Sequence, residues 1–336
     1  MNATMQLEDK KHYPVMLDQI LSIISPQHGG TFIDCTFGGG GYSSAILKHP
    51  EAKVFAIDRD EVSERHAKNL KEKFPNRFNF TRSKFSNLNQ VINSEINPRA
   101  IIFDLGISSI QLNDKKRGFS FNSKNSLCME MGINKYNAYD VINTFDEKSL
   151  SNIIKTFGEE KDNKRIAKAI SKYRGKNIIQ TSEELFQIIR KVKKNNYNFK
   201  KNPATKTFQA IRIFVNQELT ELILGLIEAT KILKKGGMLI VISFHSLEDK
   251  IIKYFFNFYS NLKQNPSRYL PSKENKSQLF KLLSKKPLIP TSKEILYNNS
   301  SRSAKLRYAV RNNNSFFYPS EFTKKYQNYF NLEGRY

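Results

Sequence analysis

Apolar residues recur in two different rhythms along the first hundred residues. Short apolar runs have the length of buried strands, and the segments between them are rich in helix formers and lack Gly and Pro. The predicted strands are Thr31–Cys35, Val54–Ile57, Phe78–Thr81 and Ala100–Leu105, and the predicted helical segments are Asp18–Ile24, Tyr42–Lys48 and Glu61–Phe74. Strand and helix in turn, with short connections, predict an α/β fold in which helices wrap a parallel sheet.

This alternation stops after Gln111 and resumes near residue 206. The interval holds polar loops and helical patterns, at Asn113–Asn125, Glu147–Phe157, Asn163–Tyr173 and Glu183–Lys193. Beyond it follow a long helix, a strand, a helix and a strand-like segment, at Phe208–Leu233, Met238–Phe244, Ser246–Phe256 and Ala304–Val310. We therefore expect a discontinuous domain of residues 1–111 and 206–336, interrupted by a helical domain of residues 112–205.

The charge balance indicates a class of binding partner. The chain has 55 Lys and Arg against 31 Asp and Glu, a formal net charge of +24. Such a surface attracts polyanions, and nucleic acid is the expected one. The alternative is that AT-rich coding has inflated Lys together with Asn and Ile.

The composition also argues against several other classes of protein. The strongly apolar stretches, such as Met238–Phe244, are far shorter than the roughly 20 residues of a membrane span. The first residues lack an apolar signal core. Two cysteines, Cys35 and Cys128, allow neither a disulfide framework nor a zinc cluster. We expect a cytoplasmic protein with no membrane partner and no metal.

A glycine run lies between the first strand and the helix after it. Gly38–Gly41 allows a sharp turn and close approach of a ligand to the backbone, although a purely structural turn is the alternative. The second strand ends in Asp58, 18 residues after Gly40, near the spacing at which an acid binds a ribose diol. The third glycine of the dinucleotide fingerprint is missing, since Ser43 or Ser44 takes its place. With Asp34 at the strand end, this favours S-adenosyl-L-methionine over NAD.

Several longer motifs carry a resemblance to a known family. They include HYPVMLDQIL from His12, TFIDCTFGGGGYS, IIFDLGISSIQL, PATKTFQAIRIFVNQEL from Pro203, VISFHSLED from Val241 and SRSAKLR from Ser301. In these motifs the chain resembles the ribosomal RNA small subunit methyltransferase H family, over roughly His12 to Val310. The resemblance implies methylation of the exocyclic N4 of a cytosine in the decoding region of 16S ribosomal RNA. It implies a Rossmann-like S-adenosylmethionine-dependent methyltransferase domain with an inserted helical domain that recognises substrate. The substrate would be 16S ribosomal RNA in the small ribosomal subunit, and a homodimer is among the open oligomeric states.

The resemblance also assigns cofactor contacts. These are Gly40, Gly41, Tyr42, Asp58, Phe85, Asp104 and Gln111. Tyr42 stands where many members have His, and Ile110 replaces a usual Pro. The segment Ser126–Gly132 departs furthest, because Cys128, Glu130 and Gly132 replace three charged positions.

Methylation of a cytosine amine requires an acceptor that polarises its N–H bond. Asp104, at the end of the fourth strand, is the first candidate, and ordering the loop or contacting the cofactor is its alternative. Asn216 and His245 are further candidates, with capping, packing or a structural hydrogen bond as competing explanations.

RNA contacts are predicted at aromatic and basic positions. Phe119 and Phe121 are candidates for stacking on a flipped base, with packing against the insert as the competitor. The tract Arg190–Lys206, with seven basic residues and no acid, and the segment near residue 305 are candidates for phosphate contact, against a solvated loop and a charged edge strand. The basic residues concerned are Lys193, Lys194, Lys200, Lys201, Arg302, Lys305 and Arg307.

Two rival functions stay open at this point. One is an NAD-dependent oxidoreductase whose basic charge is incidental, and the glycine spacing counts against it. The other is a non-catalytic RNA-binding or ribosome-assembly protein on the same fold, which the altered segment Ser126–Gly132 keeps open.

Overall fold

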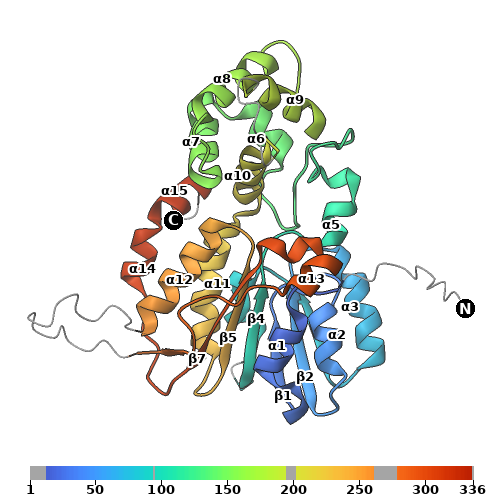
Figure 1. The fold of residues 1–336 in the computed structure, drawn as a ribbon, viewed down its shortest axis with the longest axis vertical. Coiled ribbons are helices and arrows are strands. Elements are labelled where there is room, and N and C mark those ends of the chain that lie inside the picture. Colours follow the sequence, from blue (N-terminus) through green and yellow to red (C-terminus); the bar gives the residue numbers. More distant parts are fainter. Residues whose placement is uncertain (1–12, 94, 194–201, 261–277, 335–336) are drawn as a thin grey trace, which may run out of the picture.

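A seven-stranded sheet forms the base of the molecule (Figure 1). The computed structural model describes residues 13–93, 95–193, 202–260 and 278–334. The strand order is β3-β2-β1-β4-β5-β7-β6. The first five strands pair in parallel, and β7 and β6 run antiparallel at the end of the sheet. The strands are β1 (Gly30–Asp34), β2 (Ala52–Asp58), β3 (Phe78–Arg82), β4 (Pro98–Asp104), β5 (Met238–Ser243), β6 (Phe280–Leu282) and β7 (Lys305–Arg311).

Alternate residues of each central strand face two separate apolar cores. On β4, Ala100 and Ile102 belong to one core, and Ile101 and Phe103 to the other. Helices α1 (Leu17–Ile24), α2 (Gly41–Leu47) and α3 (Val62–Lys73) cover the first face, and α4 (Leu88–Val91), α11 (Glu218–Ile232) and α12 (Ser246–Ser260) cover the second. Because both faces are covered, the strands are apolar at nearly every position, as parallel sheets require.

A group of helices stands above the carboxyl ends of the parallel strands (Figure 1). Helix α7 packs against α8 and α10, and α8 packs against α9. Side chains of Asn137, Asp146 and Thr181 cap the first turns of α6, α7 and α9, as expected for Asn, Asp and Thr before a helix. The bounds are α6 (Ala138–Thr144), α7 (Glu147–Gly158), α8 (Asn163–Arg174), α9 (Ser182–Val192) and α10 (Thr205–Asn216), with the short α5 (Ser109–Asn113) below. The domain boundaries at residues 111/112 and 205/206 stay a prediction.

The long helix predicted at Phe208–Leu233 is two helices. Gln217 adopts a left-handed conformation, with φ 53°, and separates α10 from α11. The apolar pattern runs through both halves, so it gave no sign of the break. The change of direction lets α10 belong to the upper helices while α11 covers the sheet (Figure 1).

The C-terminal part is more structured than its polar sequence indicates. Besides β6, it contains α13 (Ser292–Tyr297), α14 (Ser320–Lys325) and α15 (Gln327–Glu333). Phe322 of α14 is fully buried against Phe255 of α12, and Tyr329 of α15 contacts Phe157 of α7. These last helices therefore connect the sheet layer with the upper helices.

Within the described ranges, the helices are too short or too polar to cross a membrane.

Candidate functional site

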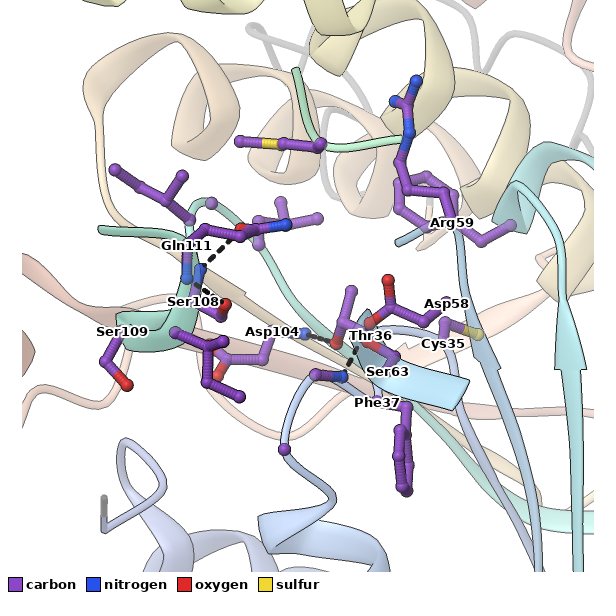
Figure 2. Close-up of a pocket in the computed structure, with 18 of the residues that line it drawn as sticks. Cys35, Thr36, Phe37, Asp58, Arg59, Ser63, Asp104, Ser108, Ser109 and Gln111 are labelled. Carbon is purple, nitrogen blue, oxygen red and sulfur yellow. Dashed lines mark hydrogen bonds between the residues drawn. The ribbon is translucent and has the colours of Figure 1, made fainter. Parts of the chain in front are cut away.

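Three carboxylates mark the edge of the sheet where the site lies. Asp34, Asp58 and Asp104 are the last residues of β1, β2 and β4, so parallel pairing brings all three to one edge. A pocket opens there, as is usual at the carboxyl ends of such sheets. Of the seven predicted cofactor residues, Gly41, Tyr42, Asp58, Phe85, Asp104 and Gln111 line it (Figure 2 shows three of them by name).

The glycine loop turns tightly between β1 and α2. The Gly38 N–H donates to Asp58 Oδ2 at 2.6 Å, and the Gly40 N–H donates to Phe37 O at 2.7 Å (Figure 2 draws the first of these). Gly40 has φ +78°, and a Cβ there would lie 2.7 Å from the Phe37 ring. Gly40 therefore faces Phe37, and Gly38 and Gly39 line the pocket in its place. A run of four glycines does not reveal which members line a pocket, and the cofactor contact of Gly40 stays a prediction.

Asp58 joins the glycine loop to the turn after β2. Its Oδ1 accepts from the Asp60 N–H at 2.8 Å, and Oδ2 accepts from Gly38. Burial raises the pKa of Asp58, while these N–H donors oppose the rise. Each carboxylate oxygen has a second acceptor site, so Asp58 can still bind hydroxyl groups.

Asp104 is the most perturbed acid of the pocket. Burial raises its pKa to about 8, and the neighbouring Asp34 and Glu248 act in the same direction. Among the residues that the structure describes, its buried Oδ1 has no hydrogen-bond partner, whereas Oδ2 lies 3.2 Å from Tyr42 Oη. Tyr42 Oη also lies 2.5 Å from Val15 O. An unpartnered buried acceptor in a pocket is a place where a ligand donor or cation would bind.

Gln111 and Phe85 both line the pocket. Gln111 completes a capping box with Ser108 on α5, and its Nε2 donates to Asp60 Oδ2 at 2.7 Å. Arg117 forms a bidentate ion pair with the same Asp60. Burial alone would raise the pKa of Asp60, but the hydrogen bonds from Arg117 and Gln111 outweigh it and lower the pKa. Phe85 packs edge-on against Phe103.

Two segments that are far apart in the sequence meet at the pocket. Pro14 and Val15 line it together with Ser300. The Met16 N–H donates to Glu294 Oε1 at 2.7 Å, across 278 positions of sequence. Residues before β1 and residues before β7 thus close the same wall.

A network of charged residues lies at the pocket, and three of its members were not predicted from the sequence: Arg212, Glu218 and Glu248. Arg212 pairs with Glu218 through two hydrogen bonds of 2.8 Å, and both side chains are nearly buried. Glu248 accepts from the Phe244 N–H at 2.8 Å, and its Oε1 lies 3.2 Å from His245 Nε2. Among the described residues, Glu218, His245 and Glu248 could hold a metal ion by geometry. Since Arg212 already supplies a positive charge to this network, we assign no metal there.

Different signals could have revealed this network. Glu248 follows the end of β5 in SFHSLED, and polar residues at such strand ends are natural candidates. Glu218 and Arg212 gave no signal, because they lie on opposite sides of the unpredicted break at Gln217.

Two of the three catalytic candidates have structural roles. Asn216 does not line the pocket, and its amide bonds to Met129 O, to the Met131 N–H and to Asn134. These contacts occupy the amide and match the packing alternative, and a role of Asn216 as the acceptor stays a prediction. His245 Nδ1 accepts from the Glu248 N–H at 3.4 Å at the start of α12, which is the structural hydrogen bond foreseen as its alternative.

Phe119 and Phe121 are packed within the protein. Phe119 is buried in the second core, and Phe121 contacts the rings of Phe186 and Phe208. The packing alternative therefore describes both rings in this conformation. Loop sequence alone did not reveal that α9 and α10 cover them.

The predicted phosphate contacts divide into four groups. Arg302 is exposed. Lys193 forms a buried ion pair with Glu160, and Arg307 pairs with Asp249 at 2.7 Å. Acids that lie far from them in the sequence neutralise both, and their contact with RNA phosphate stays a prediction. The side chain of Lys305 is 44% exposed and also pairs with Asp249. Lys194, Lys200 and Lys201 lie outside the described residues.

The unusual segment Ser126–Gly132 has a clear structural role. Gly132 has φ +95°, and a Cβ there would lie 2.3 Å from Arg59 O. The Arg59 guanidinium donates to Gly132 O and Asn216 O, so it fastens the segment to the end of α10. Cys128 Sγ donates to Glu130. The glycine therefore permits the close approach of this segment to the turn after β2.

Comparison with known proteins agrees with these features. The family model described as the MraW methylase family matches residues 9–312. A protein of Ehrlichia ruminantium named "Ribosomal RNA small subunit methyltransferase H" is 44% identical over 304 residues, covering 89% of this chain and 99% of that protein. Its namesake in Rickettsia canadensis is 41% identical over 307 residues, covering 89% and 97%.

Solved structures are more distant. An rRNA methylase from Streptococcus thermophilus matches at a TM-score of 0.39 and 10% identity, covering 87% of this chain and 96% of that one. At this level the match adds nothing to the fold seen directly. The family model spans nearly the whole chain, and the Ehrlichia and Rickettsia proteins align along almost their full length. On these two findings, the chain belongs to the MraW methylase family.

Proposed function

We propose that this protein uses S-adenosyl-L-methionine to methylate the exocyclic N4 of a cytosine in the decoding region of 16S ribosomal RNA. Support comes from the membership of the methylase family and from the names of the Ehrlichia and Rickettsia relatives. The base and its position rest on the sequence resemblance. The substrate proposed is the RNA within the small ribosomal subunit.

The pocket fits this cofactor on one observation in particular. Asp104 Oδ1 is buried, unpartnered and at the wall of the pocket, as an acceptor for a cationic ligand would be. Asp58 would hold the ribose hydroxyls, the loop at Gly38–Gly41 would let the ligand approach the backbone, and Phe85 would lie beside the adenine. When bound, the cofactor supplies an electrophilic methyl group on a sulfonium.

The chain has to make the cytosine amine reactive. The lone pair of N4 is delocalised into the ring, so its N–H needs an acceptor that withdraws the proton as the new bond forms. Asp104 is the group we assign to this task, because it lines the pocket whereas Asn216 and His245 do not. The pocket walls orient the amine, and the residues before β1 and β7 help exclude water.

Nucleoside mass spectrometry of 16S ribosomal RNA tests the proposed function. Cells lacking the gene should lose N4-methylcytidine, and purified protein should restore it on their small subunits. Binding of the cofactor without any methyl transfer would instead favour a non-catalytic RNA-binding protein.

Replacing Asp58 tests the ribose assignment. Asp58→Ala should weaken S-adenosylmethionine binding by about tenfold or more, because charged hydrogen bonds contribute roughly 1.5–3 kcal/mol. It should also cost some stability, since Gly38 and Asp60 lose their acceptor. Isothermal titration measures the affinity, with Glu61→Gln as the exposed acidic control. An unchanged affinity would remove Asp58 from the site.

A further inference from the structure

The Tyr42 hydroxyl group has one hydrogen atom but lies close to two oxygen atoms that can accept it. Tyr42 Oη lies 2.5 Å from Val15 O and 3.2 Å from Asp104 Oδ2. A phenol has a single hydrogen, and a backbone carbonyl can only accept. The hydrogen of Tyr42 therefore belongs to the shorter contact, with Val15. Between Tyr42 and Asp104 a hydrogen is then missing, and only the carboxyl group can supply it.

The surroundings of Asp104 also favour a neutral carboxyl group. The charged neighbours that act on it are the carboxylates Asp34, from β1, and Glu248, from α12. Glu294, from α13, acts on Tyr42, and the positive charge of Arg212 acts on Glu248. A buried carboxylate facing other carboxylates is costly, and protonation removes that cost. Burial raises the pKa of Asp104 to about 8 against the lowering effect that a hydrogen bond from Tyr42 has, which agrees with a neutral carboxyl group.

We propose that Asp104 is a protonated carboxylic acid in the ligand-free protein, donating its hydrogen to Tyr42, and that binding of the cationic methyl donor releases this proton. The O–H bond of Asp104 breaks, the electron pair stays on the carboxylate, and the proton passes to solvent. This inference rests on the cofactor proposed above. The acceptor for the substrate amine then exists only when the methyl donor is in place, and Tyr42 is a positioning residue that accepts the hydrogen bond of protonated Asp104 until then.

Proton release on binding is the first test. Titration calorimetry of S-adenosylmethionine at pH 7, in buffers of different ionisation enthalpy, counts the protons released. The wild type should release about nine-tenths of a proton more than Asp104→Asn, the fraction that a group of pKa about 8 carries at pH 7. The difference between the two proteins cancels protons from the ligand and from other residues. Equal counts in the two proteins would overturn the proposal.

A carboxyl titration of the free protein is the second test, and it does not use the methyl donor. Carbon-13 labelled aspartate gives the pKa of Asp104 by NMR, and Asp104→Asn identifies the signal. The wild-type pKa should lie near 8, and a value near that of an exposed aspartate would overturn the proposal. If the donor fails to bind while Asp104 titrates near 8, the proposed function is wrong and the protonation of Asp104 stands.

The change in the pKa of Asp104 in the variant Tyr42→Phe shows which of the two residues donates the hydrogen bond. Tyr42→Phe removes the oxygen that accepts the proton of Asp104, so the pKa of Asp104 should fall. If Tyr42 instead donated to a carboxylate, the same variant would raise that pKa. A rise would overturn the assignment. Circular dichroism of the variant confirms that the titration is made on folded protein.

Discussion

At the scale of single residues, the surroundings of two acids at the pocket shift their pKa values in opposite directions. Asp60 is buried but receives hydrogen bonds from Arg117 and Gln111, which lower its pKa. Asp104 is buried beside other carboxylates, and its pKa rises to about 8. The first acid is therefore suited to a structural ion pair, and the second to exchange of a proton near neutral pH.

The raised pKa of Asp104 predicts a pH-dependent cost to stability. The folded protein holds this proton more tightly than the unfolded chain, so the wild type loses stability as pH rises from about 4 to about 8. Asp104→Asn removes the titration, and its stability relative to wild type should grow across that window, by a few kcal/mol. Urea unfolding at several pH values measures this. Glu61→Gln is the control, because the side chain of Glu61 is 72% exposed. A stability difference between Asp104→Asn and wild type that does not change with pH would contradict the prediction.

At the scale of elements, buried ion pairs fasten loops that carry the pocket. Arg117, in the loop after α5, forms an ion pair with Asp60 in the turn after β2. Arg59, in the same turn, holds the segment around Gly132. The position of the helices above the pocket therefore depends on contacts with the β2 turn.

Removal of Arg117 should cost more than removal of an exposed arginine. Arg117→Ala leaves the nearly buried carboxylate of Asp60 without its cation, a loss of about 3 kcal/mol. The matched control is Arg165→Ala, whose side chain is 64% exposed and whose pair with Asp162 should contribute less than about 1 kcal/mol. Denaturant unfolding compares the two variants. Equal losses would show that the Arg117 pair does not hold this loop.

Helices α14 and α15 lie beyond residue 312, where the family model ends, yet they pack into the core. Phe322→Ala should destabilise the protein by about 3–5 kcal/mol, because its ring is fully buried. Tyr318→Ala, at a side chain that is 52% exposed, should have little effect. Thermal unfolding measures both. A small effect of Phe322→Ala would mean that α14 contributes little to the folded state.

The elements that the sequence predicted are those with strong apolar rhythm. The strands around Asp34, Asp58 and Asp104 were found because they are apolar on both faces. The break at Gln217 was missed because apolar residues continue through it. The pairing of Arg307 with Asp249 was also missed, since contacts across 58 positions leave no local pattern. Most residues predicted to bind the cofactor line one pocket, since they lie at or after strand ends, and their contacts with the cofactor stay a prediction. The surroundings of Asn216 and Phe119 could not be predicted, because they depend on tertiary packing.

At the scale of the whole molecule, the excess positive charge is the feature most relevant to RNA. Part of it is neutralised internally, as at Lys193 and Arg307, and Arg302 remains exposed. The net charge of +24 still favours a polyanionic partner.

Binding to a 16S RNA fragment should therefore fall steeply with salt. Release of counterions from phosphates predicts a loss of about 100-fold or more between about 50 and about 200 mM salt. Filter binding or fluorescence anisotropy at several salt concentrations measures the slope. Arg302→Glu should weaken binding while leaving S-adenosylmethionine affinity unchanged. A flat salt response would indicate that the charge has no part in RNA recognition.

The joining of two distant chain segments over the pocket has a consequence for biosynthesis. Because Met16 is held by Glu294 and Ser300 lines the same wall, a ribosome must translate the chain past residue 300 before the cavity can close. Nascent chains stalled before that point would lack one wall of the cavity. Acquisition of ligand affinity would thus report that synthesis has passed residue 300.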